Sequence, residues 1–110
     1  MSYFVKTTKE FESELKRLSK KYPSLSRDCY ELIQLLKSDR TLGVPLGMGC
    51  YKIRLSIKSK RKGKSGGACV VTYVHVTKKL VTLLSIYDKS EQESISIGAL
   101  KRLLSGVDKE

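Results

Sequence analysis

The stretch from Thr41 to Tyr87 contains no Asp or Glu, although the whole chain has 11 acidic residues. An exposed surface normally mixes both signs, because like charges repel one another and raise the free energy of the compact state. The same stretch holds nine basic residues: Lys52, Arg54, Lys58, Lys60, Arg61, Lys62, Lys64, Lys78 and Lys79. They account for nine of the net +11 charges and leave +2 for the rest of the chain. This segment of one sign predicts a polyanionic partner, most often a nucleic acid.

Long apolar segments are also lacking. No run approaches the ~20 apolar residues that a membrane span requires, and residues 1–11 lack the apolar core of a signal peptide. We therefore expect a cytoplasmic protein with no membrane partner. With 110 residues, of which 40% are hydrophobic and 30% charged, the chain can build one hydrophobic core. We expect a single domain, residues 1–110.

Metal-ligand and disulfide patterns are absent as well. The chain has three cysteines, an odd number without a CxxC spacing, and one histidine. A zinc site needs about four such ligands. If the basic loop closes a hairpin near Lys62, Cys50 lies at its open end and Cys69 near its tip, too far apart for a disulfide. We expect three reduced thiols and no metal or other cofactor.

Apolar periodicity in the first half of the chain predicts a short strand at 3–6 and two helices. Thr7 and Glu10 match a capping box, with Thr7 as the cap. The stripe of the first helix is Phe11, Leu15, Leu18 and Tyr22, and Pro23 ends it. The second helix should begin between Pro23 and Ser26 and run to about Lys37. A connection this short predicts an antiparallel helix pair that covers one face of a sheet.

Alternation of apolar and polar residues predicts three strands in the second half, at 51–58, 69–76 and 80–87. Residues 39–49 contain several glycines and Pro45, so we expect a loop there. A closing helix is expected at 95–105. The order β-α-α-β-β-β-α predicts an α+β fold: a twisted antiparallel sheet with helices on one face and the other face open.

Strand alternation also predicts which side chains share that open face. Lys52, Arg54, Ser56 and Lys58 should point away from the core. On the last strand Val81, Leu83, Ser85 and Tyr87 should share one side, which Lys89 continues. Taken alone, Lys52 and Arg54 are ordinary solvent-facing residues and Tyr87 an ordinary packed aromatic. The absence of acids around the basic pair favours a binding role.

Several segments together carry a family resemblance: GCYKIRL, KGKSGGACVV, LLSIYDKSE and the closing SIGALKRLL, after an opening strand and two helices. They match in order over nearly the whole chain. The sequence resembles the RelE/ParE superfamily of toxins, in its RelE/HigB-like branch. The resemblance implies a microbial-RNase-like RelE fold and a type II toxin-antitoxin system. It further implies an mRNA interferase, a hydrolase that enters the ribosome, cuts messenger RNA without a metal and inhibits translation. Its implied partners are the ribosome, mRNA and a cognate antitoxin, in a hetero-oligomer that binds operator DNA through the antitoxin.

The resemblance also suggests roles for individual residues. Lys52 matches a general base or phosphate binder, Arg54 a stabiliser of developing charge, and Lys89 an acid or clamp. Further RNA contacts are expected from a larger set: Lys58, Lys60, Arg61, Lys62, Lys64 and Tyr87, the last by stacking on a base.

Two departures from the family pattern keep other functions open. Cys69 stands where relatives commonly have Arg, and Ile95 lies near the place of a catalytic Tyr. A catalytically weakened homologue that binds RNA or antitoxin is therefore one alternative. A DNA gyrase inhibitor like the ParE branch is another, although a protein-targeted inhibitor has no need for basic residues that converge on one phosphate.

Overall fold

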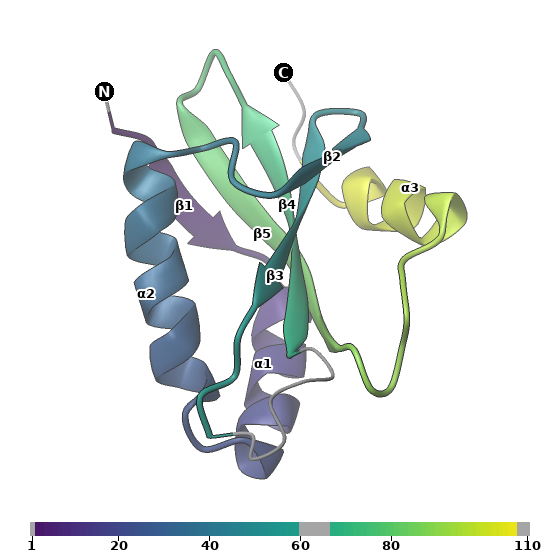
Figure 1. Ribbon diagram of the computed structural model, residues 1–110. Coiled ribbons are helices and arrows are strands. Elements are labelled where there is room, and N and C mark those ends of the chain that lie inside the picture. Colours follow the sequence, from purple (N-terminus) through teal and green to yellow (C-terminus); the bar gives the residue numbers. More distant parts are fainter. Residues whose placement is uncertain (1, 60–66, 108–110) are drawn as a thin grey trace.

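The fold is known from a computed structural model that describes residues 2–59 and 67–107 (Figure 1). The elements are β1 (Phe4–Thr7), α1 (Lys9–Lys21), α2 (Leu25–Ser38), β2 (Val44–Gly47), β3 (Cys50–Leu55), β4 (Ala68–His75), β5 (Leu80–Asp88) and α3 (Ile97–Ser105). The α+β class, the early helix pair and the closing helix are as predicted. The strand β2 was not.

One five-stranded sheet runs in the order β1-β5-β4-β3-β2. The predicted antiparallel meander is confirmed in β3, β4 and β5, but the sheet is mixed because β1 pairs with β5 in parallel. β2 lies in the predicted loop and pairs with the start of β3. Its Pro45 lacks a backbone donor, which an edge strand tolerates. Four residues that include Pro and Gly carry too little pattern to be recognised as a strand.

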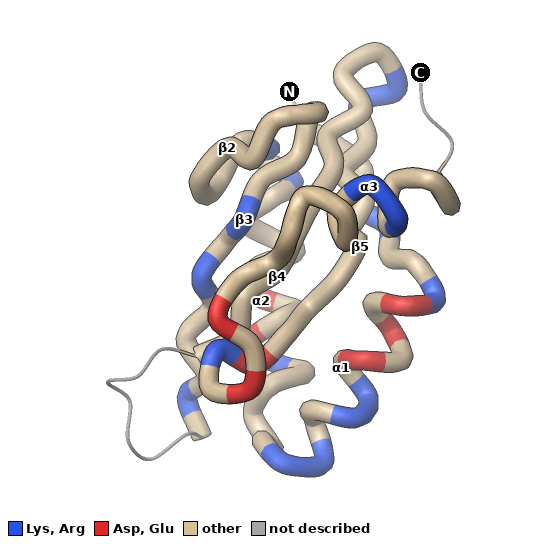
Figure 2. The backbone as a smooth tube through the Cα atoms, turned by 90° about the vertical axis from the view of Figure 1, so that its right-hand side faces the viewer, with Lys and Arg blue, Asp and Glu red and all other residues tan. Residues whose placement is uncertain are grey.

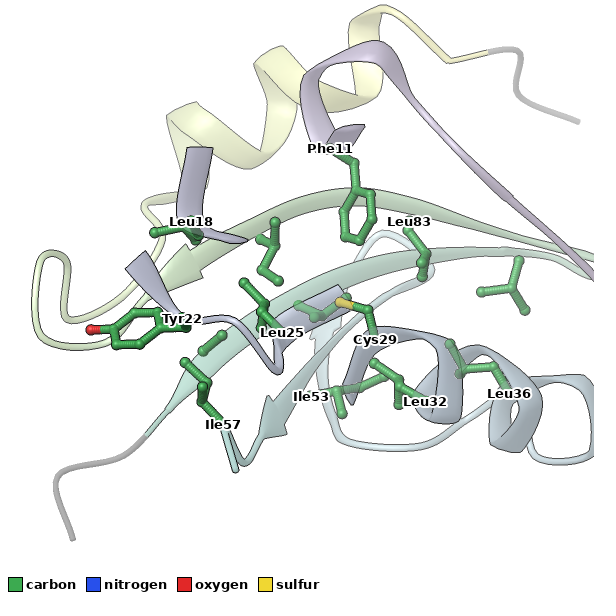
Figure 3. Packing of buried hydrophobic residues seen from close by; sticks show 14 of the residues in the cluster. Phe11, Leu18, Tyr22, Leu25, Cys29, Leu32, Leu36, Ile53, Ile57 and Leu83 are labelled. Atoms are coloured by element: carbon green, nitrogen blue, oxygen red, sulfur yellow. The ribbon is translucent and has the colours of Figure 1, made fainter. Parts of the chain in front are cut away.

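The first face of the sheet is covered by α1 and α2. Phe11 and Leu18 from α1, and Leu25, Leu32 and Leu36 from α2, are 5% exposed or less and point toward the strands (Figure 3). Truncating a side chain as buried as Leu36 typically costs ~2–5 kcal/mol. The predicted stripes of both helices are therefore confirmed, and they form the main core.

The cap of α1 differs from the prediction by one residue. Thr8, not Thr7, accepts the hydrogen bond from Phe11 N, at 3.1 Å. Thr7 still pairs with Leu83 as the last residue of β1, and its hydroxyl donates to Glu12 at 2.6 Å. The strand therefore extends one residue further than its sequence pattern shows, and the cap shifts with it.

The second face of the sheet is partly covered, where we expected it to be open. Leu100, Leu103 and Leu104 of α3 pack against a second buried cluster that includes Cys69 and Tyr87. In Figure 1, α2 and α3 lie on opposite sides of the sheet. The apolar stripe of α3 was visible in the sequence, but periodicity alone does not say which face a helix covers.

A β-bulge in β5 changes which side chains share a face. The register shifts opposite Val71 and Thr72, so strict alternation fails between Leu83 and Ser85. Val81, Leu83 and Ile86 all belong to the α1/α2 core, whereas Leu84 and Tyr87 belong to the α3 cluster. The predicted grouping of Leu83 with Tyr87 is therefore wrong. Within the described residues, no helix is long and apolar enough to cross a bilayer.

Candidate nucleic-acid interface

Arg54, Cys69 and Tyr87 form one row across the sheet. Arg54 pairs with Cys69 on β4, and Cys69 pairs with Tyr87 on β5. Lys52 lies two residues before Arg54 on the same strand, so both basic side chains project from the face that α3 partly covers. Arg54 is exposed and Lys52 is half-buried. The basic pair predicted from the sequence therefore lies on the same face of the sheet as the α3 cluster.

Neither basic side chain is neutralised within the part of the chain that the structure describes. No ion pair or hydrogen bond joins the Lys52 ammonium or the Arg54 guanidinium to another described residue. Two other exposed arginines have carboxylate partners: Arg17 with Glu14 and Glu91, and Arg102 with Glu10. An unpaired guanidinium keeps its donors for a bidentate contact with a phosphate.

Lys89 follows β5 directly and lies at the same end of the sheet as Arg54. Its backbone N–H donates to Gly67 O at 3.0 Å, and its ammonium donates to Glu93 O at 3.4 Å. The turn around it carries both signs of charge, unlike β3 (Figure 2). Two acids of this turn have partners on α1 or at its end: Glu91 pairs with Arg17 at 2.9 Å, and Asp88 accepts from the Tyr22 hydroxyl at 2.7 Å.

The predicted loop residues Lys60, Arg61, Lys62 and Lys64 lie outside the described residues. The chain on either side of them is anchored. Lys58 N donates to Asp28 Oδ2 at 3.1 Å, and Ser59 N donates to Ser24 Oγ at 2.8 Å. After the gap, Gly67 O accepts from Lys89 N. A side chain at position 67 would collide with Leu55 O, so only glycine allows this close approach of the strands.

Lys58, unlike Lys52 and Arg54, has a carboxylate partner. Its ammonium forms an ion pair of 3.1 Å with Glu31 on α2, between side chains that are 67% and 49% exposed. Such an exposed pair contributes ~0–1 kcal/mol and breaks at little cost. A role for Lys58 in RNA binding stays a prediction.

Tyr87 is only 5% exposed, so its ring does not face solvent. Burial, with a smaller contribution from the neighbouring Cys69 thiol, raises the pKa of Tyr87 to about 12. Stacking of this ring on a nucleobase would require α3 to move away. In the folded arrangement Tyr87 packs in the α3 cluster, next to Cys69.

Comparison with known proteins gives a fold but no sequence family. No family model and no curated protein matches the chain. Solved structures do match the chain, among them three from E. coli. A double mutant of the RelE toxin in the free state is 17% identical, with a TM-score of 0.64 over 98% of this chain and 100% of that one. The isolated RelE toxin is 19% identical, with a TM-score of 0.58 over 96% and 100%. A chain of the intact RelBE toxin-antitoxin complex is 21% identical, with a TM-score of 0.57 over 79% and 96%.

The chain has the RelE fold. The expected fold is thereby confirmed over nearly its whole length, including the helix pair and the closing helix. Identities of this size show the shared fold alone.

The structure shows where Cys69 and Ile95 lie, the two residues that depart from the pattern of the resemblance. Cys69 is 1% exposed and lies between Arg54 and Tyr87, under α3. Ile95 is half-buried against the same cluster. Both positions therefore contribute packing in this chain.

Sequence reasoning missed two buried acids that position parts of the candidate site. Asp28 anchors residue 58, and Asp88 anchors the turn that carries Lys89. They are 3% and 0% exposed. The sequence did give an indication for Asp28. This residue interrupts the apolar stripe of α2 beside Cys29, where burial of an unpartnered carboxylate would be costly.

Proposed function

We propose that this protein is a type II toxin that cleaves mRNA on the ribosome. One observation carries the proposal: on a RelE fold, Arg54 and Lys52 share one face and have no carboxylate partner among the described residues. Their strand lies in a stretch of the chain without acids. A protein that only needed solubility would gain nothing from excluding acids there.

The reaction we propose is transesterification within the RNA. The ribose 2′-oxygen attacks the adjacent phosphorus, the bond from phosphorus to the 5′-oxygen breaks, and a 2′,3′-cyclic phosphate and a 5′-hydroxyl result. Arg54 stabilises the added negative charge on the phosphate. Lys52 binds the phosphate or takes the 2′ proton, and Lys89 donates a proton to the leaving oxygen or clamps the strand.

The proposed partners follow from the same fold. The E. coli RelBE complex pairs a chain of this fold with an antitoxin, and we extend that pairing to this protein. The net charge of +11 favours an antitoxin with an acidic segment. We further propose that the hetero-oligomer binds operator DNA through the antitoxin.

Expression without an antitoxin tests the function. Growth should arrest, and the 5′ ends of RNA should map new cuts within translated messages. A message that lacks a ribosome-binding site, expressed in the same cells, serves as the control and should stay intact. Arrest with intact mRNA and stalled DNA replication would reject the proposal in favour of gyrase inhibition.

A second candidate is an RNA- or antitoxin-binding homologue without cleavage. The buried Cys69 favours it, because a thiol in the row beside Arg54 supplies no charge to a phosphate. Ribosome binding without any cut in a programmed complex would select this function.

A further inference from the structure

Val44 is an exposed apolar side chain beside the basic pair. It is 58% exposed, and it pairs with Lys52 across β2 and β3. Directly paired residues of neighbouring strands share a face, with Cβ atoms ~4.5–5.5 Å apart. Val44 therefore lies on the face from which Lys52 and Arg54 project. Leu46, the next residue but one on β2, packs against the α3 cluster of that face.

Packing within the fold does not account for the character of Val44. The structure describes every residue of β2 and β3, and Val44 is the exposed large apolar side chain of these two strands. β2 is an edge strand of the sheet. Edge strands usually carry charged residues on their exposed positions, because exposed apolar edges favour aggregation. The methyl groups of Val44 therefore offer contact area to a bound molecule.

The backbone on both sides of Val44 is held against β3. Gly43 has a φ of 97°, and a side-chain carbon there would collide with Lys52 O. Only glycine allows this close approach of the two strands. On the other side, the ring of Pro45 fixes its φ. Val44 thus has a set position relative to Lys52 before any ligand binds, which lowers the entropic cost of binding.

We propose that Val44 forms an apolar subsite for a nucleobase of the RNA strand whose phosphate Lys52 and Arg54 bind. The inference rests on the proposed function and adds a base contact to it. Nucleobases pack their faces on side chains, whereas the phosphates between them require cations. Tyr87, which the sequence predicts to stack on a base, is 5% exposed. Val44 is exposed on the same face and takes this role.

The surroundings of Val44 favour RNA over the apolar surface of a protein. A stable protein interface buries ~800 Å² on each partner, and charged residues are depleted at its centre. Here two cations adjoin Val44, and neither has a carboxylate partner among the described residues. Covering Lys52 and Arg54 with an apolar surface would cost free energy. A nucleotide brings a negative charge for the cations and an apolar face for Val44.

The test measures binding of the isolated protein to a trinucleotide with 2′-O-methyl riboses, which cannot be cleaved because it lacks the attacking hydroxyl. The same strand without a base, at each position in turn, isolates the base contact. Removal of the base that contacts Val44 should weaken wild-type binding about fourfold or more, as expected for one buried methylene or more. Val44→Thr should weaken binding of the intact strand by a similar factor and leave binding of that abasic strand unchanged.

Val76→Thr is the matched control. Val76 is 59% exposed, close to the 58% of Val44, but it lies in the connection between β4 and β5. This substitution should leave the affinity for both strands unchanged. Equal losses for Val44→Thr and Val76→Thr, or an equal loss for the intact and abasic strands with Val44→Thr, would overturn the subsite.

A measurement on the wild-type protein needs no variant. NMR should show nuclear Overhauser contacts between the Val44 methyl groups and the protons of one base, and their absence would also overturn the subsite. Failure of the proposed function gives a different result. Binding that depends on the base, without cleavage on ribosomes, would reject the nuclease and keep the subsite. Cleavage on ribosomes, with trinucleotide binding that ignores the base, would reject the subsite and keep the nuclease.

Discussion

The hydroxyl of Tyr22 donates a 2.7 Å hydrogen bond to Oδ2 of Asp88, and this bond joins the end of α1 to the end of β5. Asp88 is fully buried. Its Oδ1 accepts from both the backbone N–H and the hydroxyl of Ser90, at 2.9 and 2.8 Å. The Lys21 ammonium lies 3.5 Å from Oδ2. Together these contacts fix the turn from which Lys89 projects.

Tyr22→Phe should therefore lower the free energy of unfolding by about 1.5–3 kcal/mol, the usual contribution of a hydrogen bond to a charged group. Urea unfolding followed by circular dichroism measures the change. Tyr30→Phe is the matched control, because Tyr30 is 62% exposed, and it should stay within about 0.5 kcal/mol of wild type. Equal effects of the two substitutions would show that the Tyr22–Asp88 bond does not support the turn.

An arginine at position 69, which the sequence resemblance implies there, should unfold the protein rather than activate it. Cys69 is 1% exposed in the cluster under α3. Cys69→Arg would bury a charge without a partner and should cost about 3 kcal/mol or more. Cys69→Ala, which keeps the site apolar, should cost about 1 kcal/mol. A stable Cys69→Arg protein that cleaves faster would show instead that α3 readily leaves this row.

The raised pKa of Tyr87 predicts a loss of stability in alkali. Its phenol has an ordinary pKa of 10.0 and holds its proton to about 12 in the folded protein. Between these values the unfolded chain loses the proton first, so stability falls as pH rises. Tyr87→Phe should make urea midpoints decline less steeply above about pH 10, and Tyr30→Phe should not. Identical slopes for Tyr87→Phe and wild type would contradict this assignment.

The sequence predicted those parts of the fold that local periodicity determines. The stripes of α1 and α2 and the alternation of β3 each involve neighbours along the chain, so Phe11, Leu32 and Ile53 were placed correctly. The side of the sheet that α3 covers depends on contacts far apart in sequence, and no local pattern reports them. The bulge in β5 likewise reversed the expected side of Leu83 relative to Tyr87.

The site was predictable to a similar extent. Lys52 and Arg54 share the predicted face because two residues on a regular strand always do. Tyr87 was expected on the surface and is buried, since its exposure depends on α3. The pairing of Lys58 with Glu31 follows from how α2 lies against β3, which the sequence does not specify.

The last prediction separates catalysis from electrostatic attraction at the basic pair. Arg54→Ala should leave ribosome binding nearly unchanged and slow cleavage by about 10²–10³-fold, the usual effect of removing one preorganised charge stabiliser. Single-turnover cleavage on programmed ribosomes measures the rate, and a binding titration measures the affinity. Arg17→Ala is the matched control: it removes an exposed arginine whose charge Glu14 and Glu91 already neutralise, so cleavage should continue at the wild-type rate. If Arg54→Ala cleaved at the wild-type rate, Arg54 would have no role in the reaction. If both variants slowed cleavage equally, the effect would come from net charge alone.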